Sequence, residues 1–454
     1  METIITEIAE EFIKNICAKL REGKSFSQIE PSMLKEAKEC AAQLTSVYIS
    51  AVDAQILEEK AGRRELGYRV ERHGDERQLQ TVFGEVTYCR TYYKKASGGY
   101  EYLADTALGI ESRERISEGL SLSLVSAAKD MAYGKASDHL TNGTVSRQTV
   151  MQKVRRSEAA VEIPEKRRVS ELHIDADEAH VTLCRGKKSE VPLISVYEGI
   201  EKQGKRNKCK NVFHISEYGK KPDELWEQVL SEIEKRYDLT DTRVYLHGDG
   251  ASWIQNGFEW IPNAVFVLDK YHKNKAIKAM TAGLTQEDRR LFDGEIRWAL
   301  AEEELRFFDE LTQSLCEGMP EREEKILESS AYLRRFVSGI SICEKDPRAN
   351  NGGCTEPHVS HVLSARLSSR PMAWSRETLK RLAPVLAAGR ISFSKTQQCA
   401  VLSNPLRNAA ASASKEFRKG SVRTAAGLPN PDAIGVLPLT AKITGTQKIL
   451  KLFT

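Results

Sequence analysis

The most constraining feature of the sequence is a series of short apolar segments between residues 172 and 268, next to which isolated carboxylates stand. Five segments have the pattern of strands, and a helical stripe lies between the third and the fourth. The strand segments are residues 172–181, 191–197, 210–216, 243–247 and 264–268, and the helix is residues 222–237. Because sites of open α/β sheets lie at strand ends, this order predicts an α/β fold with a site at those carboxylates.

The carboxylates suit a divalent metal. Asp175 and Asp177 lie two residues apart on the first segment, hence on one face of a strand, and Asp249 follows the fourth segment between two glycines. Mg²⁺, or Mn²⁺ in its place, prefers oxygen ligands, and two such ions ~3.5–4 Å apart can activate water or a sugar hydroxyl against a phosphodiester. A third acid would come from a helix. The alternative for Gly-Asp-Gly alone is a plain turn.

Two histidine motifs lie near these acids. Asp269 ends the fifth segment and is followed by His272, which could contact a phosphate or hold Asp269, or could simply begin a helix. His358 and His361 have a spacing that zinc sites use, but no cysteine pair stands near them, so zinc is the less favoured reading.

Composition excludes several classes of protein. The chain has 454 residues, 40% hydrophobic and 29% charged, with a net charge of +4, as in ordinary globular proteins. It has no apolar stretch near the ~18 residues of a membrane span, and its acidic start does not resemble a signal peptide. Its 9 cysteines are dispersed without a Cys-x-x-Cys pair. We therefore expect a cytoplasmic protein with reduced thiols and no membrane partner.

Charge is distributed unevenly along the chain. Residues 287–328 contain 14 acidic and 6 basic residues, a local net of −8, whereas residues 357–423 contain 12 basic and 2 acidic residues, a local net of +10. Such a basic stretch indicates that the protein binds a polyanion such as nucleic acid. The alternative is that these residues only form a solvent-exposed surface without a partner.

The first third of the chain has patterns of its own. Helical periodicity is followed by alternating segments that predict a small antiparallel sheet with Arg and Lys on its open face. Next, a helical segment, a glycine-containing turn and a helix capped by Ser146 have the layout of a helix-turn-helix. Its second helix would offer Arg147, Gln148 and Lys153 to DNA; an ordinary helical hairpin is the alternative.

At this point the sequence resembles a known family, the DDE-type transposases of the ISLre insertion sequences, which are akin to Mutator-like transposases. Five stretches carry the resemblance: Phe83-Gly-Glu-Val, Asp175-Ala-Asp-Glu-Ala-His180, Leu246-His-Gly-Asp-Gly-Ala-Ser-Trp253, Asp269-Lys-Tyr-His-Lys-Asn-Lys275, and the segment from Gly353 to Trp374. They span most of the chain. The resemblance implies an RNase H-like catalytic core that a helical insertion interrupts before the third acid.

The resemblance also implies a catalytic and metal-binding set of Asp177, Asp249 and Glu356, whose intervals along the chain fit such an interrupted core. Asp269 and His272 match an element that Mutator-type enzymes place after the second acid, where Asp stands here instead of Cys. Spacing cannot choose between Asp175 and Asp177, but the family pattern Asp-Glu-x-His favours Asp177. The third acid could instead be within Glu302, Glu303 and Glu304; Glu356 is preferred because it begins a helix after the insertion.

The implied activity is DNA transposition: cleavage at the ends of an element and transfer of the 3′-hydroxyl to target DNA. Backbone phosphates would be neutralised by Arg366, Arg370, Arg376, Lys380 and Arg381. Partners would be double-stranded DNA and further copies of the chain, in a dimer or larger assembly at the nucleoid. The alternatives are a structure-selective nuclease on the same core and a non-catalytic DNA-binding protein.

Together these patterns predict seven regions. They are an N-terminal helical region (1–62), a small antiparallel sheet (63–110), a helix-turn-helix-like DNA-binding region (111–163), the first part of an RNase H-like core (164–284), a helical insertion (285–350), the second part of the core (351–403) and a basic tail (404–454).

Overall fold

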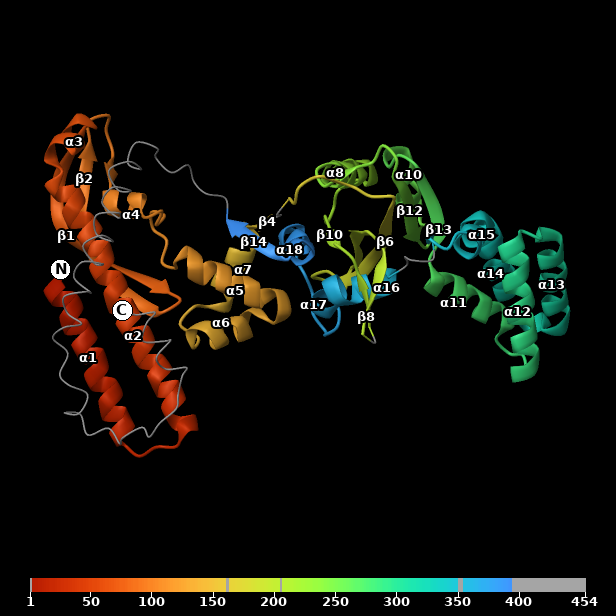
Figure 1. Ribbon diagram of the computed structural model, residues 1–454, viewed down its shortest axis with the longest axis horizontal. Helices are drawn as coiled ribbons and strands as arrows, with labels where there is room; N and C mark the ends of the chain where they lie inside the picture. The colour runs from red at the N-terminus through yellow and green to blue at the C-terminus, as the bar shows by residue number, and fades with distance from the viewer. Residues whose placement is uncertain (1, 161–162, 205, 350–353, 394–454) are drawn as a thin grey trace, which may run out of the picture. The chain divides into compact units, whose positions relative to one another are not determined.

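The computed structural model of the protein describes residues 2–160, 163–204, 206–349 and 354–393 (Figure 1). The described residues form two compact units, which divide between residues 123 and 124. The predicted tail, 404–454, and the part of the basic stretch beyond residue 393 lie outside the described residues. The fold is mixed α/β, as predicted. Among the described residues, no helix combines the length and apolarity that crossing a bilayer requires.

The first unit combines long helices with an antiparallel sheet. Helix α2 packs against strand β2 and buries Ile49, Val52 and Ile56, and its start is capped by Gln28, whose side chain accepts the N–H of Ser25 at 3.2 Å. The elements are α1 (Glu2–Arg21), α2 (Phe26–Glu58), α3 (Lys60–Glu65), α4 (Leu103–Ala107) and the strands β1 (Tyr68–Thr81), β2 (Gly84–Lys95) and β3 (Tyr100–Glu101), which pair in the order β1-β2-β3.

A buried carboxylate ties this sheet to α4. Asp105 accepts hydrogen bonds from Arg77 (Nη1–Oδ2, 2.6 Å) and Tyr88 (Oη–Oδ1, 2.7 Å) and forms a further ion pair with Arg90. Arg77 is 8% exposed. The prediction that the arginines of this sheet lie on its open face is therefore wrong for Arg77, because a buried carboxylate requires cationic partners.

The second unit contains a five-stranded sheet in the order β10-β7-β6-β12-β13. β7 runs antiparallel to both β6 and β10, whereas β12 runs parallel to β6 and to β13. The strands are β6 (Glu171–Thr182), β7 (Lys188–Tyr197), β10 (Phe213–Ile215), β12 (Arg243–Gly248) and β13 (Ala264–Leu268). The described strands overlap all five segments that the sequence pattern predicted.

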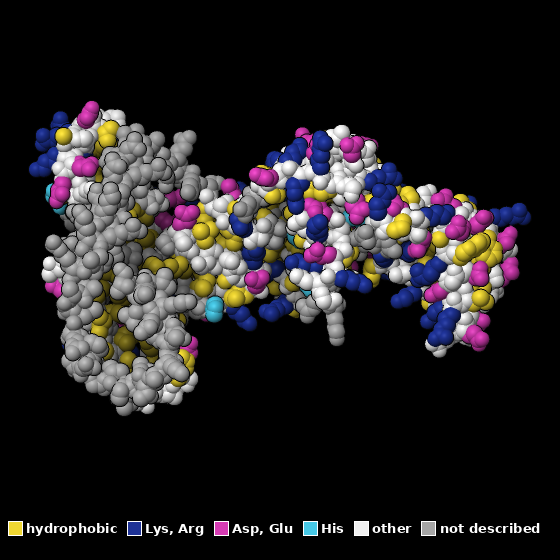
Figure 2. Space-filling model, viewed as in Figure 1, with side chains coloured by type: hydrophobic (Ala, Val, Ile, Leu, Met, Phe, Trp, Pro, Cys, Tyr) yellow, Lys and Arg dark blue, Asp and Glu magenta, His cyan; other side chains and the backbone are white. Residues whose placement is uncertain are grey.

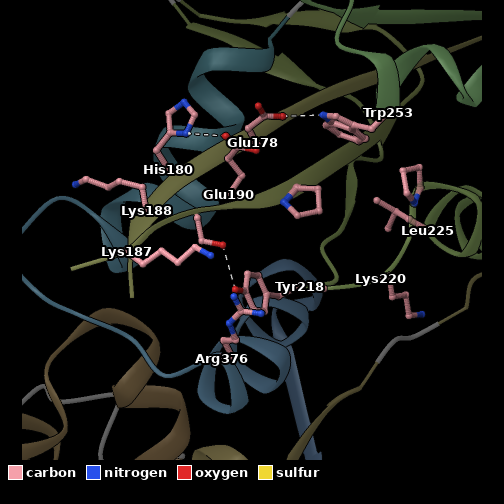
Figure 3. Close-up of a pocket in the computed structure, with 14 residues that line it drawn as sticks. Glu178, His180, Lys187, Lys188, Glu190, Tyr218, Lys220, Leu225, Trp253 and Arg376 are labelled. Carbon is pink, nitrogen blue, oxygen red and sulfur yellow. Dashed lines mark hydrogen bonds and ion pairs between the residues drawn. The ribbon is translucent and has the colours of Figure 1, made fainter. Parts of the chain in front are cut away.

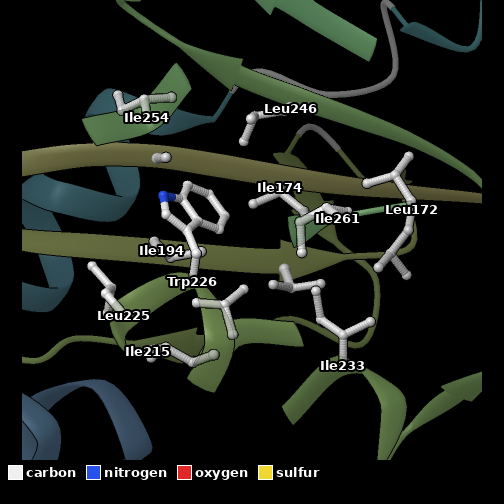
Figure 4. Close-up of a cluster of buried hydrophobic side chains, with 14 of the residues drawn as sticks. Leu172, Ile174, Ile194, Ile215, Leu225, Trp226, Ile233, Leu246, Ile254 and Ile261 are labelled. Carbon is white, nitrogen blue, oxygen red and sulfur yellow. The ribbon is translucent and has the colours of Figure 1, made fainter. Parts of the chain in front are cut away.

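One face of this sheet is apolar and is covered by helix α8 (Pro222–Glu234) (Figure 4). Alternate residues of β6, such as Ile174, and of β12, such as Leu246, point to this face because side chains alternate along a strand. Trp226 of α8 is fully buried among them. Pro222 begins the helix, where its missing N–H is not needed.

The helical insertion lies between the strands and the last helices of the second unit. Its elements are α12 (Gln286–Glu302), α13 (Leu305–Gly318), η1 (Pro320–Arg322), α14 (Glu323–Arg335) and α15 (Val337–Lys345), preceded by α11 (Lys270–Thr281). Their apolar stripes form one core around Phe308 and Leu333. Acidic side chains gather on the outer surface of these helices (Figure 2).

Helices α6 (Tyr133–Thr141) and α7 (Arg147–Arg156) are joined by a turn in which Asn142 and Gly143 have φ of 50° and 78°. Ser146 caps α7 by accepting the Thr149 N–H at 3.1 Å, and α7 packs on α18 (Arg376–Ala388). The remaining elements are α5 (Glu118–Asp130), α9 (Ser252–Gln255), α10 (Gly257–Trp260), α16 (Thr355–Val359), η3 (Ser360–Ser364), α17 (Ala365–Leu367), β4 (Ser157–Ala160), β5 (Arg167–Arg168), β8 (Ile200–Gln203), β9 (Arg206–Cys209), β11 (Tyr237–Asp238) and β14 (Arg390–Phe393).

Candidate functional site

The register of the central strands aligns three of the predicted acids. β6 and β12 are paired so that His247 lies opposite Asp175, and the same register continued by two positions places Asp249 opposite Asp177. β12 and β13 are paired so that Gly248 lies opposite Leu268, and the next position places Asp249 opposite Asp269. Asp177 on β6 therefore lies at the same level as Asp249 and Asp269, which directly follow the ends of β12 and β13. We call these three residues the carboxylate row.

The same face of the sheet holds a layer of buried polar and aromatic side chains behind the carboxylate row. His173 of β6 stacks on Tyr245 and on His247 of β12, and its Nδ1 lies 3.1 Å from Nε2 of His247. Burial lowers the pKa of His173 to about 4 and also lowers the pKa of His247. These rings are therefore neutral near pH 7 and support the strands without adding positive charge.

Asp175 lies in this buried layer and its carboxylate is fully engaged. Oδ1 accepts the hydroxyl of Tyr197 at 3.0 Å, and Oδ2 accepts the N–H of Cys354 at 2.9 Å and pairs with Nδ1 of His358 at 3.2 Å. The residue is 2% exposed. Burial raises the pKa of Asp175, partly offset by His358. Asp175 therefore anchors the start of α16 to the sheet, and of the two aspartates of β6 only Asp177 is accessible.

Asp177 is half-buried and accepts the N–H of its neighbour Glu178 at 2.8 Å. Burial raises its pKa to about 6; the Glu178 amide and the positive charge of His272 act in the opposite direction, and the charges of Glu178 and Asp249 raise it further. Among the described residues, none forms an ion pair with this carboxyl group. A bound cation would supply that partner, and would favour the ionised form.

Asp249 is presented by a tight turn after β12. Its Oδ1 accepts the N–H of Ala251 at 2.8 Å, and its carbonyl accepts the hydroxyl of Tyr332 from α14 at 2.8 Å. Gly250 follows with φ of 84°, and a side chain there would overlap the ring of Phe336. Two residues of the insertion, Tyr332 and Phe336, therefore contact the turn that carries Asp249 and fix its position.

Asp269 begins helix α11, where its Oδ2 accepts the N–H groups of Tyr271 at 3.1 Å and His272 at 3.3 Å. The same oxygen lies 3.2 Å from Nδ1 of His272. This hydrogen bond raises the pKa of His272 most, and the charges of Asp269, Asp249 and Asp177 raise it further. A protonated His272 is therefore favoured beside the carboxylate row, where it can meet a phosphate.

Glu356 is an exposed residue of α16. It lies between Cys354 and His358, which both contact Asp175. Among the described residues, no hydrogen bond or ion pair joins Glu356 to Asp177 or Asp249, and no three His, Cys, Asp or Glu side chains are grouped closely enough to hold a metal. Of the alternative acids, Glu302 pairs with Lys345 at 3.4 Å. Glu303 and Glu304 are exposed. The structure thus brings two accessible acids together, Asp177 and Asp249, with Asp269 next to them.

The residues predicted to contact DNA are of two kinds, those that the structure exposes and those that it buries. Arg147 and Gln148 at the start of α7 are exposed, but Lys153 of the same helix is only 7% exposed. Arg366 is 6% exposed, donates from Nε to the carbonyl of Ala128 at 2.7 Å and stacks on Trp374. These two cations are therefore internal and do not face a DNA backbone. The exposed members of the second group are Arg370, Arg376, Lys380 and Arg381.

Some residues near the site were not selected from the sequence. Trp253 donates its indole N–H to Glu178 at 2.7 Å, so these neighbours of Asp249 and Asp177 touch each other. Cys209 Sγ lies 3.5 Å from Nε2 of His358. Trp253 and Glu178 belong to two of the five stretches that resemble the transposase family, so their place in these stretches could have marked them as site residues. Cys209 belongs to none of the five stretches, and its sequence context gave no such indication.

Comparison with known proteins gives a consistent result. Residues 19–398 match the model of a family described as uncharacterised protein family UPF0236. UPF0236 protein TTE2489 of Caldanaerobacter subterraneus subsp. tengcongensis is 37% identical over 371 residues, 80% of this chain and 78% of the relative. Another UPF0236 protein of that organism, whose name joins eleven designations from TTE0033 to TTE2212, is 36% identical over 370 residues, 80% and 78% of the two chains. UPF0236 protein in vanSb 3′region of Streptococcus gallolyticus is 26% identical over 409 residues, 86% of each chain.

Proposed function

The chain belongs to the uncharacterised protein family UPF0236, and on that premise we propose that it is a DDE-type DNA transposase similar to those of the ISLre insertion sequences. The observation that carries the proposal is the register of the parallel strands β6 and β12, which, continued past the end of β12, aligns Asp249 with Asp177. Paired carboxylates in this position bind the divalent ions that phosphoryl transfer uses.

The strand order supports an RNase H-like core as the catalytic scaffold. Three antiparallel strands followed by a helix and two further parallel strands give the order β10-β7-β6-β12-β13, with the acids on the first and fourth strands in chain order. The helical insertion follows the fifth strand, as the family resemblance implies. Helix α16, which carries Glu356, then returns to the polar face of β6 through the contact of His358 with Asp175.

The donor set fits Mg²⁺ or Mn²⁺, because the accessible groups are carboxylate oxygens and burial holds the pKa of Asp177 above its usual range until a cation neutralises it. Asp177 and Asp249 would hold the ion, with Glu356 or Asp269 as the candidate third acid, and a bound ion supplies activation of water and stabilisation of the leaving oxygen. The chain's own residues do the positioning: Tyr332 holds the turn of Asp249, and His272 places a positive charge beside the substrate phosphate.

Recognition of double-stranded DNA would use the exposed cations. Arg376, Lys380 and Arg381 lie on α18, and Arg147 and Gln148 begin α7, which packs on the same helix. We infer that α6 and α7 act as a helix-turn-helix and that, with the sheet of the first unit, they recognise the terminal inverted repeats. Cleavage of both ends in concert requires a dimer or larger assembly, which would act at the nucleoid.

A relative's name adds support of another kind. One UPF0236 protein carries eleven joined designations from a single organism. That is expected if one protein sequence is encoded at several places in a genome, as happens when a gene moves with its own transposase. The same reading accounts for a second such name, which joins four designations.

The test is a strand-transfer assay with full-length protein, a labelled duplex carrying the element's terminal repeats and a target plasmid. We expect Mg²⁺-dependent cleavage and joining by the wild type and none by Asp177→Asn or Asp249→Asn, with DNA binding retained. Asp241→Asn, an exposed acid in the turn before β12, is the matched control and should behave as wild type. Parallel assays of Glu356→Gln and Asp269→Asn identify the third acid.

Other outcomes assign other functions. Cleavage without joining would favour a structure-selective nuclease on the same core. Binding without cleavage by the wild type would leave a DNA-binding protein whose acids are structural, and activity that survives Asp249→Asn would refute the proposed site.

A further inference from the structure

A cavity of about 550 Å³ lies on the face of β6 that carries Glu178, opposite to the face that carries Asp177 (Figure 3). Glu178, which follows Asp177, and Trp253, which follows Asp249 by four positions, both line it. Successive side chains of a strand point to opposite faces, so Asp177 and Glu178 face the two sides of β6. We call this cavity the Trp253 pocket. Its volume is in the range of small-molecule sites.

The walls of the Trp253 pocket combine aromatic rings with charges. Trp253 packs on Trp226, with ring centroids 6.4 Å apart. Tyr218, which is 8% exposed, lines another part of the pocket. Four cations lie around it: Lys187, Lys188, Lys220 and Arg376. Figure 3 shows Glu178 and Trp253 joined at one end of the pocket and Arg376 beside Tyr218 at the other.

This combination matches the chemistry of a nucleotide. An indole ring offers a stacking surface to any base, a carboxylate accepts hydrogen bonds from the amino groups of adenine, cytosine or guanine, and lysine and arginine pair with phosphates. The carboxylate of Glu178 is already held in place by the Trp253 indole at 2.7 Å. A base inside a paired duplex cannot present its ring face or its pairing edge to such a pocket.

We propose that the Trp253 pocket binds one unpaired nucleotide of the DNA, next to the bond at the carboxylate row. The inference rests on the proposed function for its substrate, DNA, but concerns a separate site. Strand β12 pairs with β6 only as far as Asp175, so Asp177 and Glu178 lie on a part of β6 that β12 does not cover. A DNA strand whose phosphate lies at the row can pass around this edge of β6 and place its adjacent nucleotide in the pocket. The pocket therefore selects DNA whose end is distorted or unpaired.

The experiment measures affinity without catalysis. Full-length Asp249→Asn protein in EDTA is titrated into two duplexes that differ only in whether one 2-aminopurine is paired or unpaired. We expect the unpaired base to bind about tenfold more tightly, with quenched fluorescence, because stacking on an aromatic side chain stabilises a base to that extent. Adding Trp253→Ala should remove both the preference and the quenching. Trp298→Ala, an exposed tryptophan of the insertion, should change neither.

Trp253 also packs in the fold, so a second variant keeps the test interpretable. Lys187 is an exposed pocket residue, and Lys187→Glu should weaken binding of the unpaired duplex without changing the thermal unfolding midpoint. Equal affinity for both duplexes, or a preference that survives both pocket variants, would overturn the proposal. Free deoxynucleotide monophosphate that binds as tightly as the unpaired duplex would also overturn it, because the site would then serve a metabolite.

The two proposals fail separately. Strand transfer by the wild type without any preference for an unpaired base would refute only the pocket. A preference that depends on Trp253 in a protein that never cuts DNA would refute only the transposase.

Discussion

Oδ2 of Asp175 lies 3.2 Å from Nδ1 of His358, although the two residues lie on opposite sides of the helical insertion in the sequence. The pair joins the first strand of the core to helix α16, and the N–H of Cys354 donates to the same carboxylate. The helix that carries Glu356 is thus attached to the polar face of the sheet by a neighbour of Asp177. Asp175 has a positioning role in this arrangement.

Replacing His358 tests that role. His358→Ala removes a partner of a carboxylate that is 2% exposed, and we expect the free energy of unfolding to fall by about 2–4 kcal/mol. Denaturant unfolding of the full chain measures it. His361→Ala, an exposed histidine three positions further on, is the control and should change stability by under ~0.5 kcal/mol. Equal stability of the two variants would contradict the anchoring role of the pair.

The raised pKa of Asp177, about 6, predicts a pH-dependent stability of the metal-free protein. The folded state favours the protonated carboxyl, so its stabilising contribution is complete below about pH 4 and is lost as the pH rises through 6. Relative to Asp177→Asn, the wild type should lose about 1–2 kcal/mol between pH 4 and pH 8, after allowance for partial exposure. Unfolding in EDTA across this range measures it, and parallel curves for the two proteins would refute it.

The affinity of the protein for Mg²⁺ should depend on the ionisation of Asp177. A metal ligand must be deprotonated, so Mg²⁺ binding should strengthen as the pH rises from 5 to 7 and should be weak in Asp177→Asn at every pH. Calorimetric titration on the DNA-bound protein measures this. Affinity that is independent of pH in the wild type would show that Asp177 is not a ligand.

Gly250 controls the position of Asp249. A side chain at this residue meets the ring of Phe336, and the φ of 84° is itself unfavourable for alanine. We expect Gly250→Ala to cost about 2–3 kcal/mol and to reduce cleavage more than DNA binding. Gly62→Ala, at a helical glycine with open space around it, should be neutral or stabilising. Partial recovery of Gly250→Ala by Phe336→Leu would identify the ring as the cause; no recovery would place the cost in the backbone.

The cations of the second unit should separate into structural and DNA-binding groups. Arg366→Ala should lower stability by about 2–3 kcal/mol through lost packing on Trp374 and a carbonyl left without its donor. Arg381→Ala should leave stability unchanged and reduce the salt dependence of DNA binding by about one ion. Thermal unfolding and binding isotherms at several salt concentrations test both, and a changed salt slope with Arg366→Ala at full stability would reverse the assignment.

The sequence by itself determined the strands, their order along the chain and the acids among them. Alternating apolar residues set each strand of the second unit, and the intervals that separate Asp177, Asp249 and Asp269 along the chain equal the offsets of the strand registers. The strands are local properties, since side-chain alternation and turn residues act within a few positions. The same holds for the cap at Ser146 and for the helix that begins at Pro222.

Only the tertiary structure decided which residues are accessible to solvent when several residues of the same type have similar surroundings in the sequence. Asp175 and Asp177 share a face of one strand, yet Asp175 is buried because Tyr197 and α16 pack on it, while Asp177 lies beyond the part of β6 that pairs with β12. Lys153 and Arg366 look like other basic residues in the sequence but are buried. Burial depends on contacts between segments far apart in the chain, and no local pattern contains that information.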